Sequence, residues 1–151
     1  ADDLLKRLES LRKTPSERNV LVIVQEMLEA SGVETRREPN YQNFYPDFAV
    51  WIDELEPYFG NPILIEVKRQ INTDRQTKYV IEQVLHYISL SNVRAVIVFA
   101  AQISSEAMQI ASSYPNLYFF ELHDFLKRLG QESLGQIIRN ERNARVHGRL
   151  R

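Results

Sequence analysis

Apolar residues recur at helical spacing in two long segments of the chain. The first runs from about residue 15 to Ser31 and is followed by Gly32, which favours a helix end there. The second runs from about Asp74 to Leu90. The two apolar stripes consist of Val20, Leu21, Val24, Met27 and Leu28, and of Val80, Ile81, Val84, Leu85 and Ile88. A single stripe predicts that each helix packs one face against a sheet or another helix.

The start of the first long helix has a polar pattern, "TPSE" at residues 14–17. Thr14 is a candidate N-cap, Pro15 suits the first helical position, and Glu17 stands three residues after the cap, as in a capping box. An amphipathic segment, Asp2 to Lys13, precedes this start and predicts a shorter helix.

Five segments have strand character: the first is extended with alternating character, and the others are apolar or rich in β-branched and aromatic residues. They are "VETRREP", "NFYPDFAVWID", "PILIEVKRQ", "VRAVIVFAA" and "NLYFFEL", at residues 33–39, 43–53, 62–70, 93–101 and 116–122. "EPYFGNP" at residues 56–62 supplies turn residues before the third strand. We expect the aromatic residues around the second strand to pack in the core. These are Tyr41, Phe44, Tyr45, Phe48 and Trp51.

The remaining segments are helical. "SSEAMQIASSYP" predicts a helix that Pro115 ends, and the residues from His123 onward are mostly helical with an Arg-rich tail. The order is helix, three strands, helix, strand, helix, strand, helix. It predicts an α/β fold with a mixed sheet flanked by helices, in which the first three strands form an antiparallel meander and the later ones a parallel pair. We expect residues 1–151 to form one domain.

Composition narrows the function classes. With 44% hydrophobic and 26% charged residues the chain resembles an ordinary soluble protein, and no apolar run approaches the ~20 residues that span a bilayer, so no membrane partner is expected. Cys is absent, which excludes disulfides and thiolate zinc sites and suits a reducing cytoplasm. The charged start "ADDLLKRLES" does not resemble a secretory signal, so we expect a cytoplasmic location. A net charge of -1 means that any nucleic-acid contact must come from a local patch.

Two charges interrupt the otherwise apolar third strand. Glu66 and Lys68 are two residues apart, so they share one face of that strand. In isolation the two would simply pair with each other. Asp47, however, lies in the preceding strand, where a hairpin would bring it beside Glu66. Two carboxylates ~5 Å apart repel by about 3 kcal/mol at an effective dielectric near 20.

A divalent cation offsets this repulsion better than one Lys does. Mg²⁺ takes oxygen ligands, usually one or two carboxylates with waters and phosphate oxygens, and it polarises a phosphodiester and activates a bound water. Lys68 would then orient or deprotonate the attacking water or stabilise the charged transition state. The pattern therefore indicates a metal-and-phosphate site.

These residues resemble a known family. Pro46–Asp47 followed by Glu66-Val67-Lys68 is similar to the motif of the PD-(D/E)xK nuclease superfamily, which has the restriction-endonuclease-like fold, and the element order resembles its αβββαβ core. The resemblance covers roughly residues 14–121. It implies that Asp47 and Glu66 bind the metal and that Lys68 is the catalytic lysine.

Two further positions fit this resemblance. Gln83 and Tyr87, four residues apart on the second long helix, resemble the QxxxY element of RecB-type exonucleases, where it lies near the site and DNA; on a helix shoulder they could equally be structural. Glu17 falls on the inner face of the first long helix and matches an additional acidic metal position of many members. Its alternative role is the capping box described above.

The Arg-rich tail has two interpretations. Arg139, Arg142, Arg145, Arg149 and Arg151 would contact phosphates, or they form a solvated helix end. "RNARVH", Arg142 to His147, also resembles the RNxxxH signature of HEPN-type ribonucleases, but those are all-helical bundles and the strands here contradict that fold. His86 and His123 are isolated and form no metal-ligand spacing.

The first hypothesis is therefore a Mg²⁺- or Mn²⁺-dependent nuclease that hydrolyses DNA, with Asp47, Glu66 and Lys68 at the reaction centre and Gln83 placing substrate or lysine. The family context suggests restriction in host defence or DNA repair, as a homodimer or as part of a larger restriction assembly. The second is a module of the same fold that binds nucleic acid or protein without cutting. The third is a metal-independent ribonuclease that uses Arg142 and His147.

Overall fold

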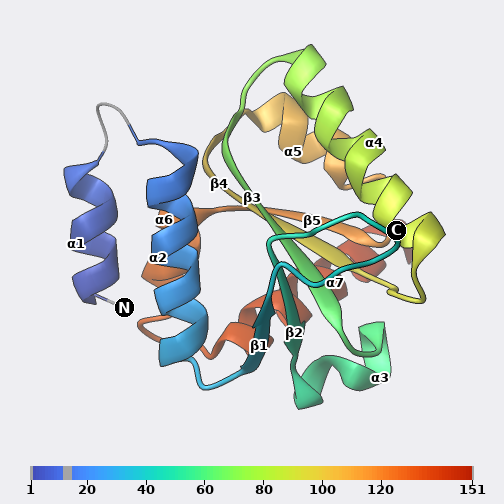
Figure 1. Ribbon diagram of the computed structural model, residues 1–151, viewed down its shortest axis with the longest axis horizontal. Helices are drawn as coiled ribbons and strands as arrows, with labels where there is room; N and C mark the ends of the chain where they lie inside the picture. Colours follow the sequence, from blue (N-terminus) through green and yellow to red (C-terminus); the bar gives the residue numbers. More distant parts are fainter. Residues whose placement is uncertain (1, 12–14, 151) are drawn as a thin grey trace.

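The centre of the molecule is a five-stranded mixed sheet (Figure 1). The computed structural model describes residues 2–11 and 15–150, with side chains up to residue 148. The strands are β1 (Glu34–Arg37), β2 (Phe48–Trp51), β3 (Ile63–Ile71), β4 (Val96–Ile103) and β5 (Leu117–Glu121). They lie side by side in chain order. β1, β2 and β3 are antiparallel neighbours, whereas β3, β4 and β5 are parallel. This confirms the expected α/β class, the meander and the parallel strands.

Helices cover both faces of the sheet (Figure 1). They are α1 (Asp2–Ser10), α2 (Glu17–Ala30), α3 (Glu56–Phe59), α4 (Asp74–Leu90), α5 (Ser105–Ala111), α6 (Leu122–Arg128) and α7 (Leu134–Leu150), with a 3₁₀ turn, η1 (Asp53–Leu55), before α3. Side chains of α1, α2, α6 and α7 share one core with one face of the sheet, while α4 and α5 share a second core with the other face. The α4 bounds agree with the prediction.

The alternation of side chains along β3 explains these two cores. Ile63, Ile65 and Val67 point into the core under α2, and Leu64 points into the core under α4. Glu66 has the parity of Leu64 and therefore belongs to the α4 side. The apolar run is continuous because helices cover both faces of the strand. On the face toward α4, the side chains change from apolar at Leu64 to charged at Glu66 and Lys68.

The first long helix begins differently from the prediction. Its N-cap is Ser16, whose side-chain oxygen accepts a hydrogen bond from the Asn19 N–H at 3.1 Å, and Glu17 is the first helical residue. The capping box with Glu17 three residues after the cap is therefore wrong; Thr14 itself lies outside the described residues. Ser16 takes the role because its backbone is extended and one turn of N–H donors lies directly after it. The helix end is confirmed, since Gly32 has φ 72°.

Three other expectations need correction. "EPYFGNP" contributes the helix α3 rather than a simple turn, and α5 ends at Ala111, ahead of Pro115. Leu85 of the predicted α4 stripe is exposed.

The aromatic residues before β2 also differ from the expectation of a packed core. Phe44 and Tyr45 are exposed, and Tyr41 and Trp51 are only partly buried; Phe48 alone of the five is fully buried. The reason is that β2 begins at Phe48, two residues after Pro46, so that Phe44 and Tyr45 belong to the connection before the strand. Pro lacks a backbone N–H and cannot donate to the ladder at this place.

Candidate active site

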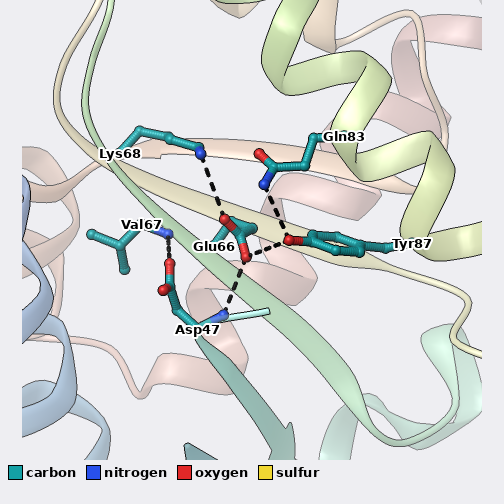
Figure 2. Close-up of polar contacts among 6 residues, drawn as sticks. All are labelled: Asp47, Glu66, Val67, Lys68, Gln83 and Tyr87. Carbon is teal, nitrogen blue, oxygen red and sulfur yellow. Dashed lines mark hydrogen bonds and ion pairs between the residues drawn. The ribbon is translucent and has the colours of Figure 1, made fainter. Parts of the chain in front are cut away.

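The site forms where β2 and β3 separate. Phe48 is paired with Ile65, so the next antiparallel step brings Asp47 opposite Glu66. The Asp47 N–H donates to Glu66 Oε1 at 3.1 Å, and the Val67 N–H donates to Asp47 Oδ2 at 2.7 Å (Figure 2). The Asp47 carboxylate thus replaces a strand partner for the β3 backbone. These reciprocal bonds fix both carboxylates, as the hairpin hypothesis requires.

The α4 helix places a hydrogen-bonded pair against the buried Glu66. The Tyr87 hydroxyl donates to Glu66 Oε1 at 3.1 Å, and Gln83 Nε2 donates to the Tyr87 oxygen at 3.1 Å. The spacing of four residues puts both side chains on one stripe of the helix. Tyr87 is buried, so it is part of the second core as well as of the site. Gln83 Oε1 is buried and has no hydrogen-bond partner among the described residues.

Lys68 completes the cluster from the same face of β3. Its Nζ lies 3.7 Å from Glu66 Oε2, and its side chain is 18% exposed, whereas that of Glu66 is 5% exposed. The Lys68 Nζ also lies 5.6 Å from the centre of the Tyr79 ring. The ammonium therefore stands at the rim, between the buried carboxylate and solvent.

Burial and mutual repulsion make both carboxylates hard to charge. Burial raises the pKa of Glu66 to about 7, and the nearby Asp47 charge adds to the effect, while Lys68 and the hydrogen bonds from Tyr87 and the Asp47 N–H oppose it. Burial also raises the pKa of Asp47. The Val67 N–H opposes that shift, and the charge of Glu17 adds to it. Two desolvated carboxyl groups share one amine, so a further positive charge would stabilise their ionised forms.

The donor set fits a hard divalent cation. Asp47 Oδ1 accepts no hydrogen bond from the described residues, and Glu66 Oε2 faces only Lys68 among them. These two oxygens can therefore serve as ligands, and Mg²⁺ commonly takes one or two carboxylates and completes its shell with water and phosphate oxygens. No group of three or more His, Cys, Asp or Glu side chains in the described part of the chain forms a complete metal cage.

Glu17 lies at the edge of this site. It is exposed at the first position of α2, and its charge is close enough to raise the pKa of Asp47. It is not part of a three-carboxylate group in the described residues. Its predicted role as a metal ligand stays a prediction.

The Arg residues of the tail lie on α7 and contact other parts of the chain. Arg145 donates to the carbonyl oxygens of Tyr114 and Leu117, and its guanidinium carbon lies 4.0 Å from the Tyr118 ring centre. Arg142 lies 4.7 Å over the Tyr58 ring. The side chain of Arg149 is outside the described ones. Contact of these residues with nucleic acid stays a prediction.

The RNxxxH segment lies on α7, and its side chains are exposed or half-buried. Arg142 donates to the adjacent Asn143 side chain, and His147 is exposed. The segment belongs to a molecule built around a five-stranded sheet, whereas the resemblance to HEPN-type ribonucleases implies an all-helical bundle. The fold therefore gives that resemblance no support.

Two aromatic residues beside the site escaped the sequence analysis. Tyr79 lies four residues before Gln83 on the α4 stripe, and Phe44 reaches the same helix from the connection before β2, where its ring contacts His86 and Tyr87. The spacing of Tyr79, Gln83 and Tyr87 was a usable signal. For Phe44 none was available, since an aromatic residue next to a strand is most simply a core residue.

Comparison with known proteins leaves the function to be argued from these side chains. No protein-family model matches the sequence, and no curated protein matches it. Among solved structures, a repair endonuclease from Pyrococcus abyssi is similar, with a TM-score of 0.49 and 15% sequence identity over 66% of this chain and 45% of that chain. The chain therefore spans less than half the length of that endonuclease. Within the described residues no helix has the length and apolar content to cross a membrane.

Proposed function

We propose that this protein is a Mg²⁺- or Mn²⁺-dependent nuclease that hydrolyses phosphodiester bonds in DNA. The observation that carries the proposal is the meeting of Asp47, Glu66 and Lys68 where the start of β2 lies beside β3 (Figure 2). Buried carboxylates that share a small space need a cation, and an adjacent rim amine suits an anionic substrate.

Each residue has a chemical task on this account. Asp47 Oδ1 and Glu66 Oε2 would hold the cation, which supplies charge neutralisation at the phosphate and activation of water when bound. Asp47 Oδ2 stays on the Val67 N–H, and Glu66 Oε1 stays on Tyr87, so each carboxylate keeps one oxygen for orientation. Glu17 would add negative potential to the same site, since its charge already acts on Asp47.

Lys68 would act on the substrate phosphate. With Glu66 Oε2 given to a cation, the Lys68 ammonium would stabilise negative charge on the phosphate oxygens or orient the attacking water. Gln83 would hold the Tyr87 hydroxyl toward Glu66 and thereby keep the ligand oxygen in place. The Gln83 hydrogen bond is already in place, and the Lys68 ammonium already lies 3.7 Å from Glu66 Oε2.

The test is cleavage of supercoiled plasmid and linear DNA with Mg²⁺ or Mn²⁺. We expect the wild type to cut and Lys68→Ala to lose at least ~100-fold in rate, the range typical of a positioned acid–base or charge-stabilising group. Lys78→Ala, an exposed lysine of α4, is the matched control and should keep wild-type activity. Equal activity of Lys68→Ala and wild type, or no cleavage of any DNA or RNA, would refute the proposal.

A second candidate is a module that binds nucleic acid or protein on the same fold without cutting. It is favoured by one observation: the Lys68 ammonium already neutralises Glu66 in part. Calorimetric titration separates the two, because the nuclease should bind Mn²⁺ in the wild type and lose that binding in Asp47→Asn. A binding module should show no such carboxylate-dependent heat.

The biological setting proposed for the nuclease is restriction in host defence or DNA repair. Cutting both strands of a duplex with so small a domain would be served by a homodimer or by a larger restriction assembly, since two-fold symmetry is the commonest arrangement. Sedimentation of the protein with and without a DNA duplex would measure whether two copies assemble.

A further inference from the structure

A shallow cleft lies directly beside the carboxylate cluster. It has a volume of about 350 Å³ and is lined by Phe44, Tyr79, Glu82, Gln83 and His86. Gln83 belongs to both places, because its Nε2 holds the Tyr87 hydroxyl that donates to Glu66. Tyr79 links them a second time, since its ring faces the Lys68 ammonium at 5.6 Å. We call these five lining residues the aromatic cleft.

The two rings of the aromatic cleft are offered to solvent rather than packed away. Phe44 is 37% exposed and Tyr79 is 63% exposed. Phe44 meets His86 edge-on, with ring centres 4.3 Å apart at 72°, and it meets Tyr87 edge-on at 6.2 Å and 78°. Neither contact is a parallel stack, and the 37% exposed fraction of Phe44 leaves ring surface available to a ligand.

The turn that carries Phe44 is held in place by several bonds. Tyr41 and Phe44 exchange two backbone hydrogen bonds, and Gln42 and Asn43 between them both have positive φ. The Gln42 side chain donates to the carbonyl oxygen of Leu90 at the end of α4. Two left-handed non-glycine residues are an unfavourable way to make a turn. The chain keeps this conformation, and it holds Phe44 against α4.

The charges of the aromatic cleft determine what fits it. None of its five lining residues is Lys or Arg, and Glu82 contributes a carboxylate, so a phosphate would be repelled there. Flat neutral rings with an amide, a carboxylate and an imidazole instead match a nucleobase, which stacks on its face and carries donors and acceptors on its edge. Lys68 does not line the cleft, but its ammonium lies 5.6 Å from the Tyr79 ring centre, where it would meet a backbone phosphate next to the base.

We propose that the aromatic cleft receives one unstacked nucleobase of the strand whose phosphate lies at Asp47, Glu66 and Lys68. A base inside an intact duplex is stacked and paired and cannot reach the rings without being extruded. The substrate class is therefore single-stranded DNA or a strand with unpaired nucleotides next to the cut. This rests on the proposed nuclease function, whose substrate it specifies.

Binding measurements test the proposal separately from cleavage. With the full chain and a labelled single-stranded oligonucleotide, in EDTA and at fixed low salt, anisotropy should show tighter binding than to the matched duplex. Phe44→Ala and Tyr79→Ala should each weaken single-strand binding roughly 10-fold, the usual loss for one base stack. Tyr79→Phe keeps the ring and should bind as the wild type does. Tyr45→Ala is the control, because Tyr45 is 55% exposed on the same connection but does not line the cleft.

Photocrosslinking adds a readout that does not depend on how the variants fold. A single-stranded oligonucleotide carrying 5-iodouracil should form its adduct on Phe44 or Tyr79 in the wild-type protein. Adducts located only elsewhere, or equal affinity of Tyr79→Ala and wild type, would overturn the proposal even if plasmid cleavage is observed. Stacking with no cleavage would instead refute the nuclease function and leave base binding standing.

Discussion

Replacement of Glu66 by Gln should make the protein more stable at alkaline pH in the absence of metal. The pKa of Glu66 is raised from 4.5 to about 7 in the folded protein, mainly by burial. The folded state therefore keeps a proton that the unfolded chain releases near the lower value. Stability falls as the pH rises between the two values, because the folded state binds more protons in that window.

The size of this effect follows from the shift. At 1.36 kcal/mol for each pKa unit, the ionised Glu66 lowers the free energy of unfolding by about 3 kcal/mol once the pH exceeds the folded pKa. Below the unfolded pKa the loss is absent. Gln has nearly the same shape, does not ionise, and its carbonyl oxygen can still accept from the Asp47 N–H and the Tyr87 hydroxyl. The weaker contact with Lys68 offsets part of the gain.

Urea unfolding with EDTA at pH 5 and pH 8.5 measures the difference. The quantity compared is the free energy of unfolding of Glu66→Gln minus that of the wild type. We expect this difference to be about 2 kcal/mol larger at pH 8.5 than at pH 5. Glu106→Gln, which removes an exposed carboxylate of α5, should give the same difference at both pH values. Parallel wild-type and Glu66→Gln profiles would refute the reasoning about burial. Saturating Mg²⁺ at pH 8.5 should stabilise only the wild type.

Three further substitutions probe the supports of the site and the fold. Tyr87→Phe removes the hydroxyl that donates to Glu66 and should lower the free energy of unfolding, measured with urea at pH 8.5, by ~1–2 kcal/mol. The same substitution should lower the rate of any Mg²⁺-dependent cleavage. Ser16→Ala removes the N-cap of α2 and should lower the free energy of unfolding by ~1 kcal/mol in the same assay; no change would show that another residue caps the helix. The Arg145 guanidinium packs on Tyr118, so Arg145→Gln should lower the melting temperature by several degrees and leave the salt dependence of DNA binding unchanged. A weaker salt dependence at an unchanged melting temperature would instead assign Arg145 to phosphate contact.

The strand that carries the charges could be predicted from the sequence because two independent constraints coincide there. The apolar run of β3 fixed the strand, and the period of two placed Glu66 and Lys68 on one face. The antiparallel step with Phe48 opposite Ile65 then brings Asp47 to Glu66. Hairpin pairing is short-range, so its consequences follow from local order even though α3 stands where a simple turn was expected.

The cap of α2 could not be predicted in the same way. Thr14 and Ser16 are both good N-cap residues, and the choice between them depends on where the chain leaves the preceding segment. Shifting the cap by two residues changes the position of Glu17 from the end of the first turn to its start. A role inferred from a capping box is therefore only as secure as the cap.

The burial of the aromatic residues could likewise not be predicted from the local sequence pattern. Phe44, Tyr45 and Phe48 have similar hydrophobicity, yet only Phe48 lies in the ladder of β2. Phe44 is exposed because it belongs to a turn outside the strand. That turn packs on α4, a helix that begins thirty residues further along the chain. Tyr87, by contrast, was expected on a helix shoulder and is buried against Glu66. Contacts between distant segments decide such cases.

A crystal of the wild-type protein soaked in Mn²⁺, measured for anomalous scattering, tests the central claim most directly. We expect a peak between the carboxylates of Asp47 and Glu66, about 2.1 Å from an oxygen of each, with the Lys68 ammonium moved off Glu66 Oε2. The absence of a peak there, at a Mn²⁺ concentration that saturates the protein in solution, would contradict it.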